Sequence, residues 1–191
     1  MSILQPPRPA KLVIGSFSPD KGSFSQTAEL LTAEFGEIDI VSSWFPFDYT
    51  NYYTDEMGGP LFRRMISFAQ LIEQDRLADI KHVTHRIEQK FTSDGGRRTV
   101  NIDPGYLLRE RFVLATGKNY SHRIYLGKSI YADLTLIFSG GAYRPLPWTY
   151  PDYAAGDMQA FLVRVRKKYI HDSACAGTCG TLSDRGKEKP C

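Results

Sequence analysis

The pattern of apolar residues changes from a helical period to a period of two near Arg97, and this change is typical of an α+β fold. Beyond Arg97, turn signals such as Gly140-Gly141 separate short segments rich in apolar and aromatic residues. We predict strands over the residue ranges 99–103, 111–116, 122–126, 130–138 and 143–148. These strands should form an antiparallel meander. Within 130–138, alternation puts the apolar side chains on one face and Tyr131, Asp133 and Thr135 on the other.

The first half of the chain predicts a β-α-β opening. Lys11 to Phe17 is a short apolar run typical of a buried strand, and Gln26 to Phe35 has the composition of a helix that Gly36 ends. Ile38 to Phe45 has the pattern of a second strand, which should run parallel to the first in the same sheet. Further helices are expected over the ranges 61–72, 76–91 and 157–170.

Together these elements predict a single α+β domain over residues 11–171. Its sheet should be mixed and mainly antiparallel, with the β-α-β opening, and should pack against helices. Residues 1–10 are expected to form a flexible N-terminus. The range 172–191 has almost no apolar content, so we expect a disordered tail there.

Composition narrows the class of protein. A chain of 191 residues with 42% hydrophobic and 24% charged residues is typical of one soluble globular domain. The net charge of +3 is too small to indicate nucleic acid as a partner. The sequence has no run of about eighteen apolar residues and no apolar stretch near its start, so we expect neither a membrane span nor a secretory signal. All three cysteines lie in the predicted tail, which favours the cytoplasm over an oxidising compartment.

The residues identify no cofactor and no metal site. His82 and His85 are three apart on the expected solvent side of the helix over 76–91, and Cys175 and Cys179 are four apart in the tail. Neither pair has further ligands placed beside it by the sequence, so we predict solvated histidines and no metal. Gly127-Lys128-Ser129 matches the end of a phosphate-binding loop, but it lies between two predicted strands and is better explained as a hairpin turn.

Asn101-Ile102-Asp103 is the first candidate site segment. Alternation sends Asn101 and Asp103 to one face, and Pro104-Gly105 should then end the strand in a turn, leaving the Asp103 carboxylate at its tip. That carboxylate could act as a general base, a metal ligand or an acceptor for a ribose hydroxyl. It could equally cap the turn by accepting backbone N–H groups.

A second candidate lies around the turn that contains Lys118. Together with His122 and Arg123 it brings three cationic or titratable groups to the mouth of a predicted hairpin. Such a group can hold a phosphate or a carboxylate, because Arg binds these anions bidentately and His titrates near neutral pH. Ordinary surface charges on an exposed turn are the alternative.

Aromatic segments complete the candidate site. The loop 45–53 is ringed with aromatic residues and could cover a pocket or simply pack on the edge of the core. Trp148, Tyr150 and Asp152 lie in a stiff segment flanked by prolines, and Tyr106 follows the Pro-Gly pair. These side chains could form the walls of a ligand site, or they could fasten the last helix to the sheet.

The same segments resemble an uncharacterised bacterial family, domain of unknown function 4416, over about residues 11–169. The resemblance rests on four segments: Phe45 to Thr50 with Tyr52-Tyr53, Asn101 to Tyr106, His122 to Gly127, and Pro147 to Tyr153. The family has no established activity, so the resemblance implies no reaction. Some members carry a GTP-binding label, and no guanine-nucleotide motif is recognisable in this sequence.

Our leading hypothesis from the sequence is a cytoplasmic enzyme or binding protein for a small anionic ligand, such as a nucleotide or a sugar phosphate. Lys118, His122 and Arg123 would hold the anion, while Asp103 and Asn101 would supply acid–base or hydrogen-bonding chemistry. The alternative is a non-catalytic module that binds a protein or RNA through exposed aromatic side chains. Both hypotheses depend on whether the polar segments converge in the fold.

Overall fold

A computed structural model describes residues 3–48, 53–93 and 95–179. In chain order the elements are β1 (Ala10–Ser18), α1 (Ser23–Phe35), β2 (Ile38–Val41), β3 (Phe45–Pro46), α2 (Thr54–Met57), β4 (Phe62–Ile72), the 3-10 helix η1 (Gln74–Arg76), α3 (Leu77–Glu88), β5 (Asn101–Leu107), β6 (Arg111–Thr116), β7 (Arg123–Gly127), β8 (Ile130–Ser139), β9 (Ala142–Pro145), α4 (Pro151–Ala154) and α5 (Gly156–Cys179).

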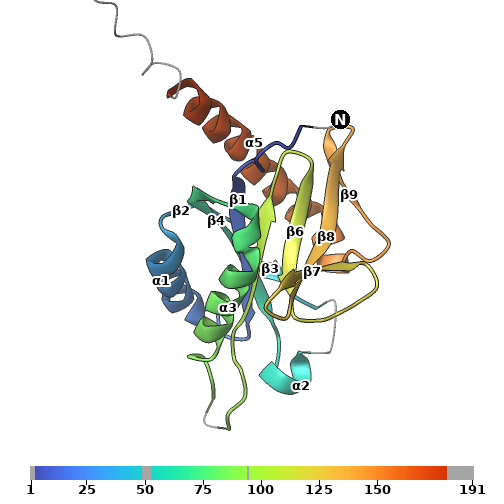
Figure 1. Cartoon of the computed structure of the whole chain (residues 1–191). Coiled ribbons are helices and arrows are strands. Elements are labelled where there is room, and N and C mark those ends of the chain that lie inside the picture. Colours follow the sequence, from blue (N-terminus) through green and yellow to red (C-terminus); the bar gives the residue numbers. More distant parts are fainter. Residues whose placement is uncertain (1–2, 49–52, 94, 180–191) are drawn as a thin grey trace, which may run out of the picture.

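The fold belongs to the α+β class, as the sequence predicted, and has three layers around one nine-stranded sheet (Figure 1). The strand order is β2-β4-β1-β5-β6-β8-β7, with β3 paired to β4 and β9 paired to β8. Helices α1 and α3 cover one face, where Leu31, Ile80 and Ile87 pack on the sheet. Helix α5 covers the other face through Phe161, Leu162, Val165 and Tyr169. Within the described ranges, none of the helices combines the length and the apolar character that a bilayer crossing requires.

The β-α-β opening is present, but its two strands are not neighbours. β2 and β1 each pair antiparallel with β4, so they run parallel to each other with β4 between them. Every pairing of the described strands is antiparallel. The prediction of a helix over 61–72 is wrong, because residues Phe62–Ile72 form strand β4. Its middle is buried on both faces, so its apolar residues do not alternate with polar ones and the strand period is hidden.

The second half contains the predicted strands, with one change of pairing. β6 pairs with β8 rather than with β7, so β7 lies at the edge of the sheet and the simple meander is not formed. The expected polar face of β8 is also buried in part: Asp133 and Thr135 are both covered by protein. A buried carboxylate needs partners. This face of β8 therefore contributes to an interior polar region.

Pro104-Gly105 does not end the strand, contrary to our prediction. β5 continues to Leu107 and remains paired with β1 throughout. The Leu108 N–H donates to the Arg111 carbonyl at the hairpin, and alternation from that bond directs residue 104 toward β6. Proline has no N–H to donate there, and the β5–β6 ladder stops at Gly105. The two strands therefore separate beyond Gly105. This opening positions the site described below.

Gly105 itself is required by close packing. A Cβ atom at this position would lie 2.5 Å from the Val113 carbonyl oxygen on β6. The absence of a side chain lets the two strands approach before they diverge.

Helix α5 continues to Cys179, beyond the expected end at Ile170, so residues 172–179 of the expected tail are helical. Asp172 joins this extension to β1, because it lies 3.4 Å from the buried Lys11 ammonium. Just before the extension, Tyr169 donates to the Pro9 carbonyl at 2.9 Å. Residues 3–9 form no helix or strand and are exposed. The rest of the expected tail, residues 180–191, and part of the aromatic loop, residues 49–52, lie outside the described residues.

Candidate functional site

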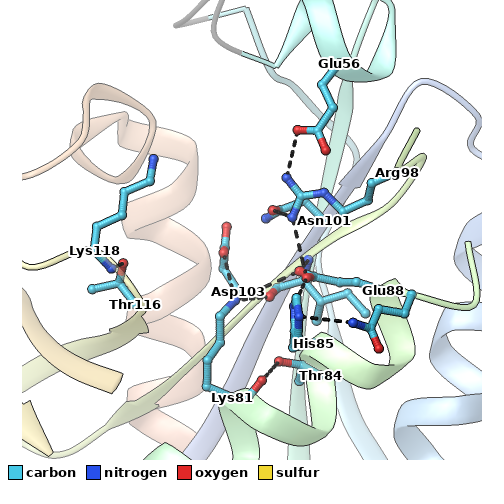
Figure 2. Close-up of polar contacts among 12 residues, drawn as sticks. Glu56, Lys81, Thr84, His85, Glu88, Arg98, Asn101, Asp103, Thr116 and Lys118 are labelled. Carbon is cyan, nitrogen blue, oxygen red and sulfur yellow. Dashed lines mark hydrogen bonds and ion pairs between the residues drawn. The ribbon is translucent and has the colours of Figure 1, made fainter. Parts of the chain in front are cut away.

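A cavity of about 680 Å³ lies where β5 and β6 separate. Helix α3 lines it from one face of the sheet, and residues 150–153 line it from the other. The ends of β5 and β6 form its flanks. Figure 2 shows part of this arrangement, with Lys118 and Thr116 on one side and Asp103, Arg98 and Glu88 on the other. The missing N–H of Pro104 thus creates an opening into which side chains from both layers project.

Glu88 organises the α3 wall of the cavity. Its side chain is only 2% exposed, and one carboxylate oxygen accepts the Ile102 N–H at 2.6 Å. The other oxygen lies 3.5 Å from the Arg98 guanidinium and 3.3 Å from the His85 ring. Lys81 approaches the first oxygen at 3.9 Å and donates to the Ile102 carbonyl at 2.7 Å. One buried carboxylate therefore holds two cavity cations at defined positions (Figure 2).

Asn101 carries a buried donor with no partner. Its Oδ1 accepts a hydrogen bond from Arg98 at 2.9 Å, which sets the orientation of the amide. Its Nδ2 is buried and finds no hydrogen-bond partner among the described residues. A donor in this condition costs about 1–3 kcal/mol. The wall of the cavity therefore contains an unused donor beside a cation.

Asp103 lies between two cations without bonding to either. Arg63 and Lys81 each approach one of its carboxylate oxygens at 3.6 Å. These distances are those of ion pairs and are too long for hydrogen bonds. With a side chain that is 27% exposed, Asp103 is the most accessible carboxylate in the cavity.

Arg123 lies on the opposite wall and is largely occupied by the protein. Its guanidinium donates to Asp133 at 2.9 Å, to the Lys118 carbonyl at 3.0 Å and to the Tyr150 hydroxyl at 3.0 Å. A further donation goes to Thr116 at 3.4 Å. Because a guanidinium has five N–H groups, one remains. Arg123 thus holds the rim of the cavity together and has little left for an anion.

The Arg63 side chain is buried among aromatic rings next to Asp103. Its guanidinium carbon lies 4.4 Å from the centre of the Phe47 ring and 5.1 Å from that of Tyr153, and it forms an ion pair with Asp152. Burial raises the pKa of Tyr153 to about 12. Burial, and next the charge of Asp103, raise the pKa of Tyr53 above its usual range. These two phenols of the cavity lining are therefore neutral near pH 7.

The structure brings most of the predicted site residues together and leaves three outside. The cavity is lined by Asn101, Asp103, Lys118, Arg123, Tyr150 and Asp152. His122 lies behind the wall, 3.3 Å from Asp133 and stacked on Trp148 with ring centroids 5.0 Å apart. Trp148 donates to the Leu134 carbonyl at 2.9 Å, and Tyr106 packs against the hydrophobic core. These three side chains have structural contacts and do not line the cavity.

The chain belongs to the family described as a domain of unknown function, DUF4416. The family model matches residues 8–169, which span the sheet and most of α5. No curated protein and no solved structure matches the chain. The cavity therefore supplies the evidence on function for this DUF4416 protein.

Five charged cavity residues were missed at the sequence level: Arg63, Lys81, Glu88, Arg98 and Asp133. A signal for two of them was present, because Lys81, His85 and Glu88 have the i, i+4, i+7 spacing of one helix face. Arg63 was hidden by the incorrect helix over 61–72. Among the described residues no three His, Cys, Asp or Glu side chains cluster as metal ligands would.

Proposed function

We propose that this DUF4416 protein binds a small anionic ligand, of the nucleotide or sugar phosphate class, in the cavity between β5 and β6. The balance of charge supports this proposal. The cavity is lined by five cationic side chains and four carboxylates: Arg63, Lys81, Arg98, Lys118 and Arg123 against Glu88, Asp103, Asp133 and Asp152. The two lining histidines, His82 and His85, add positive charge when protonated.

The observation that carries the proposal is the unpartnered amide of Asn101. Arg98 occupies its oxygen, so the nitrogen stays directed away from that cation as an unused donor. A ligand oxygen that accepts from it would recover the free energy lost by burying the donor. Because Arg98 lies beside the same amide, an anionic oxygen is favoured over a neutral one.

The geometry also distributes the roles of the remaining residues. Asp103, as the accessible carboxylate, is our candidate for acid–base or hydrogen-bonding chemistry on the bound ligand. Lys118 lies across the cavity and would contribute charge to the anion (Figure 2). We now assign Arg123 and His122 to positioning, because their polar atoms bond within the protein. An enzyme and a binding protein would share this arrangement.

A thermal-shift screen against nucleotides, sugar phosphates and inorganic phosphate tests the proposal. The decisive variant is Asn101→Asp, which keeps the acceptor for Arg98 and replaces the free donor by a carboxylate oxygen. Any anion that stabilises the wild type should bind this variant at least about 10-fold more weakly. Gln26→Glu adds the same charge at an exposed position of α1, far from the cavity lining, and should bind as the wild type does. Equal binding to Asn101→Asp, or no stabilisation by any anion, would contradict the proposal.

The cytoplasm remains our proposed compartment, because residues 11–171 contain no cysteine and an oxidising compartment favours disulfides in small domains. Cell fractionation tests this assignment. Recovery of the protein from an oxidising compartment would contradict it.

A second candidate function, a protein-interaction module, is supported by the edge strand β7. Its Ile124, Tyr125 and Leu126 are exposed, and β7 ends the sheet. Uncharged apolar edges favour pairing with another chain. Affinity purification with the wild type and with Ile124→Lys tests this function. A partner retained equally by both proteins would exclude the β7 edge as its binding surface.

A further inference from the structure

Asp103 differs from the other three carboxylates of the cavity in having uncommitted oxygens. Glu88 accepts the Ile102 N–H, Asp133 accepts from Arg123, and Asp152 pairs with Arg63; all three side chains are less than 10% exposed. Asp103 is 27% exposed, and its nearest cations lie at 3.6 Å. No described residue donates a hydrogen bond to its side chain. An ionised carboxylate has about four acceptor positions, so those of Asp103 are available to a ligand.

The surroundings of Asp103 select the kind of donor. Lys81 and Arg63 flank the carboxylate on both oxygens, so an ammonium group of a ligand would meet two like charges there. A hydroxyl group is neutral and donates one hydrogen bond without that repulsion. The favoured donor beside Asp103 is therefore a hydroxyl.

The spacing along β5 connects this hydroxyl to the anion. Asn101 and Asp103 lie two residues apart on one strand, and such residues project from the same face about 7 Å apart. Each hydrogen bond spans about 2.8 Å, so the anionic oxygen and the hydroxyl of a ligand that meets both side chains lie a few ångströms apart. A short carbon chain supplies that separation.

We propose that the ligand of this cavity is a polyol that carries a terminal phosphate or carboxylate. Its anionic group lies at Asn101 and Arg98, and one of its hydroxyls donates to Asp103. This inference rests on the proposed function, since it assigns the two ends of the same anionic ligand. It adds a requirement that the proposed function does not make, namely that removal of the hydroxyls weakens binding.

Two matched ligand pairs test the requirement by calorimetry on the full chain. Sorbitol 6-phosphate is compared with hexyl phosphate, and gluconate with hexanoate, so that each pair shares its anion and chain length and differs in hydroxyls. The wild type should bind the polyol of at least one pair about 10- to 100-fold more tightly than its alkyl partner. The pair that shows the preference identifies phosphate or carboxylate as the anion.

The variants then locate the contact. Asp103→Ala should remove most of the preference, because the polyol binds more weakly without the carboxylate. The alkyl anion should bind as well as before or better, because the negative charge of Asp103 no longer repels it. Asp103→Asn keeps one acceptor oxygen and should retain an intermediate preference, which covers the case in which Asp103→Ala does not fold. Asp75→Ala, on an exposed residue before α3, should behave as the wild type.

Three outcomes would overturn the inference. Equal binding of polyol and alkyl anions to the wild type would leave the proposed function intact and remove the hydroxyl requirement. A preference that survives in both Asp103 variants would place the hydroxyl elsewhere. Failure of all four ligands and of inorganic phosphate to bind would contradict the inference and the proposed function together.

Discussion

Replacing Glu88 by Gln removes the charge that organises the α3 wall and leaves the side-chain volume unchanged. The amide oxygen can still accept the Ile102 N–H, which the carboxylate accepts at 2.6 Å. The charge that faces Arg98 at 3.5 Å and Lys81 at 3.9 Å is lost. The perturbation therefore isolates the electrostatic part of this buried network.

The loss of unfolding free energy depends on the contacts that Arg98 and Lys81 keep in the variant. Loss of one partner of a buried ion pair costs about 3–5 kcal/mol when the other charge is left without compensation. Arg98 keeps its contacts with Glu56 and Asn101, and Lys81 keeps the Ile102 carbonyl. We therefore expect Glu88→Gln to lower the free energy of unfolding by about 2–3 kcal/mol, below the full penalty. For a domain of this size that is a fall in Tm of roughly 4–12 °C.

Urea unfolding followed by far-UV circular dichroism measures this difference. The matched control is Glu110→Gln, because the Glu110 side chain is 56% exposed and, among the described residues, pairs only with its neighbour Arg111 at 2.8 Å. An exposed pair of this kind contributes about 0–1 kcal/mol. If the two variants lose the same free energy of unfolding, the argument that Glu88 holds the wall through its charge is wrong.

The remaining predictions concern β1, β5 and α5. Lys11→Met should lower the free energy of unfolding by about 2–3 kcal/mol in urea melts, because Asp39 and Asp172 lose their buried partner and keep the more exposed Lys168. Adding Asp39→Leu should recover part of the loss, and a neutral single variant would contradict this. Pro104→Ala supplies the missing N–H. Hydrogen exchange of the new amide at residue 104 should be slow, and ligand binding should weaken because the opening between β5 and β6 narrows. Fast hydrogen exchange at residue 104 would show that the ladder ends for another reason. Partial burial opposes ionisation of Asp172, but Lys168 and Lys11 outweigh it and lower the pKa of this carboxyl. Its stabilising contribution is therefore present above its unfolded pKa and is lost as pH falls through the folded pKa. Asp172→Asn should reduce the loss of unfolding free energy at acid pH, and an unchanged loss would refute the assignment.

The sequence predicted those elements whose local pattern agrees with their final environment. The stripe of Leu77, Ile80, Thr84 and Ile87 on α3 has one apolar face and one polar face, and the structure buries that stripe. Helix α5 shows the same agreement. The strands of the second half were found because turn residues mark their ends and alternation persists between them.

The sequence-based predictions were wrong where contacts with distant segments decide the local structure. β4 is buried on both faces, so its pattern does not alternate and its composition does not distinguish a strand from a helix. Pro104-Gly105 has the chemistry of a turn, but β1 pairs with both residues and keeps the strand extended. The role of Arg123 depends on Tyr150, and that of Glu88 depends in part on the Ile102 N–H; no local pattern reveals either partner.

The sequence by itself determined the α+β class, the apolar stripes of α3 and α5, and the candidate status of Asn101 and Asp103. These follow from periodicity and residue chemistry, which act over a few positions of the chain. Only the tertiary structure decided that β5 and β6 separate at Pro104 and that Asp103 is the accessible carboxylate between them. The physical reason is that hydrogen-bond partners and burial are set by contacts between distant segments, so the same side chain can be a capping residue in one fold and a cavity wall in another.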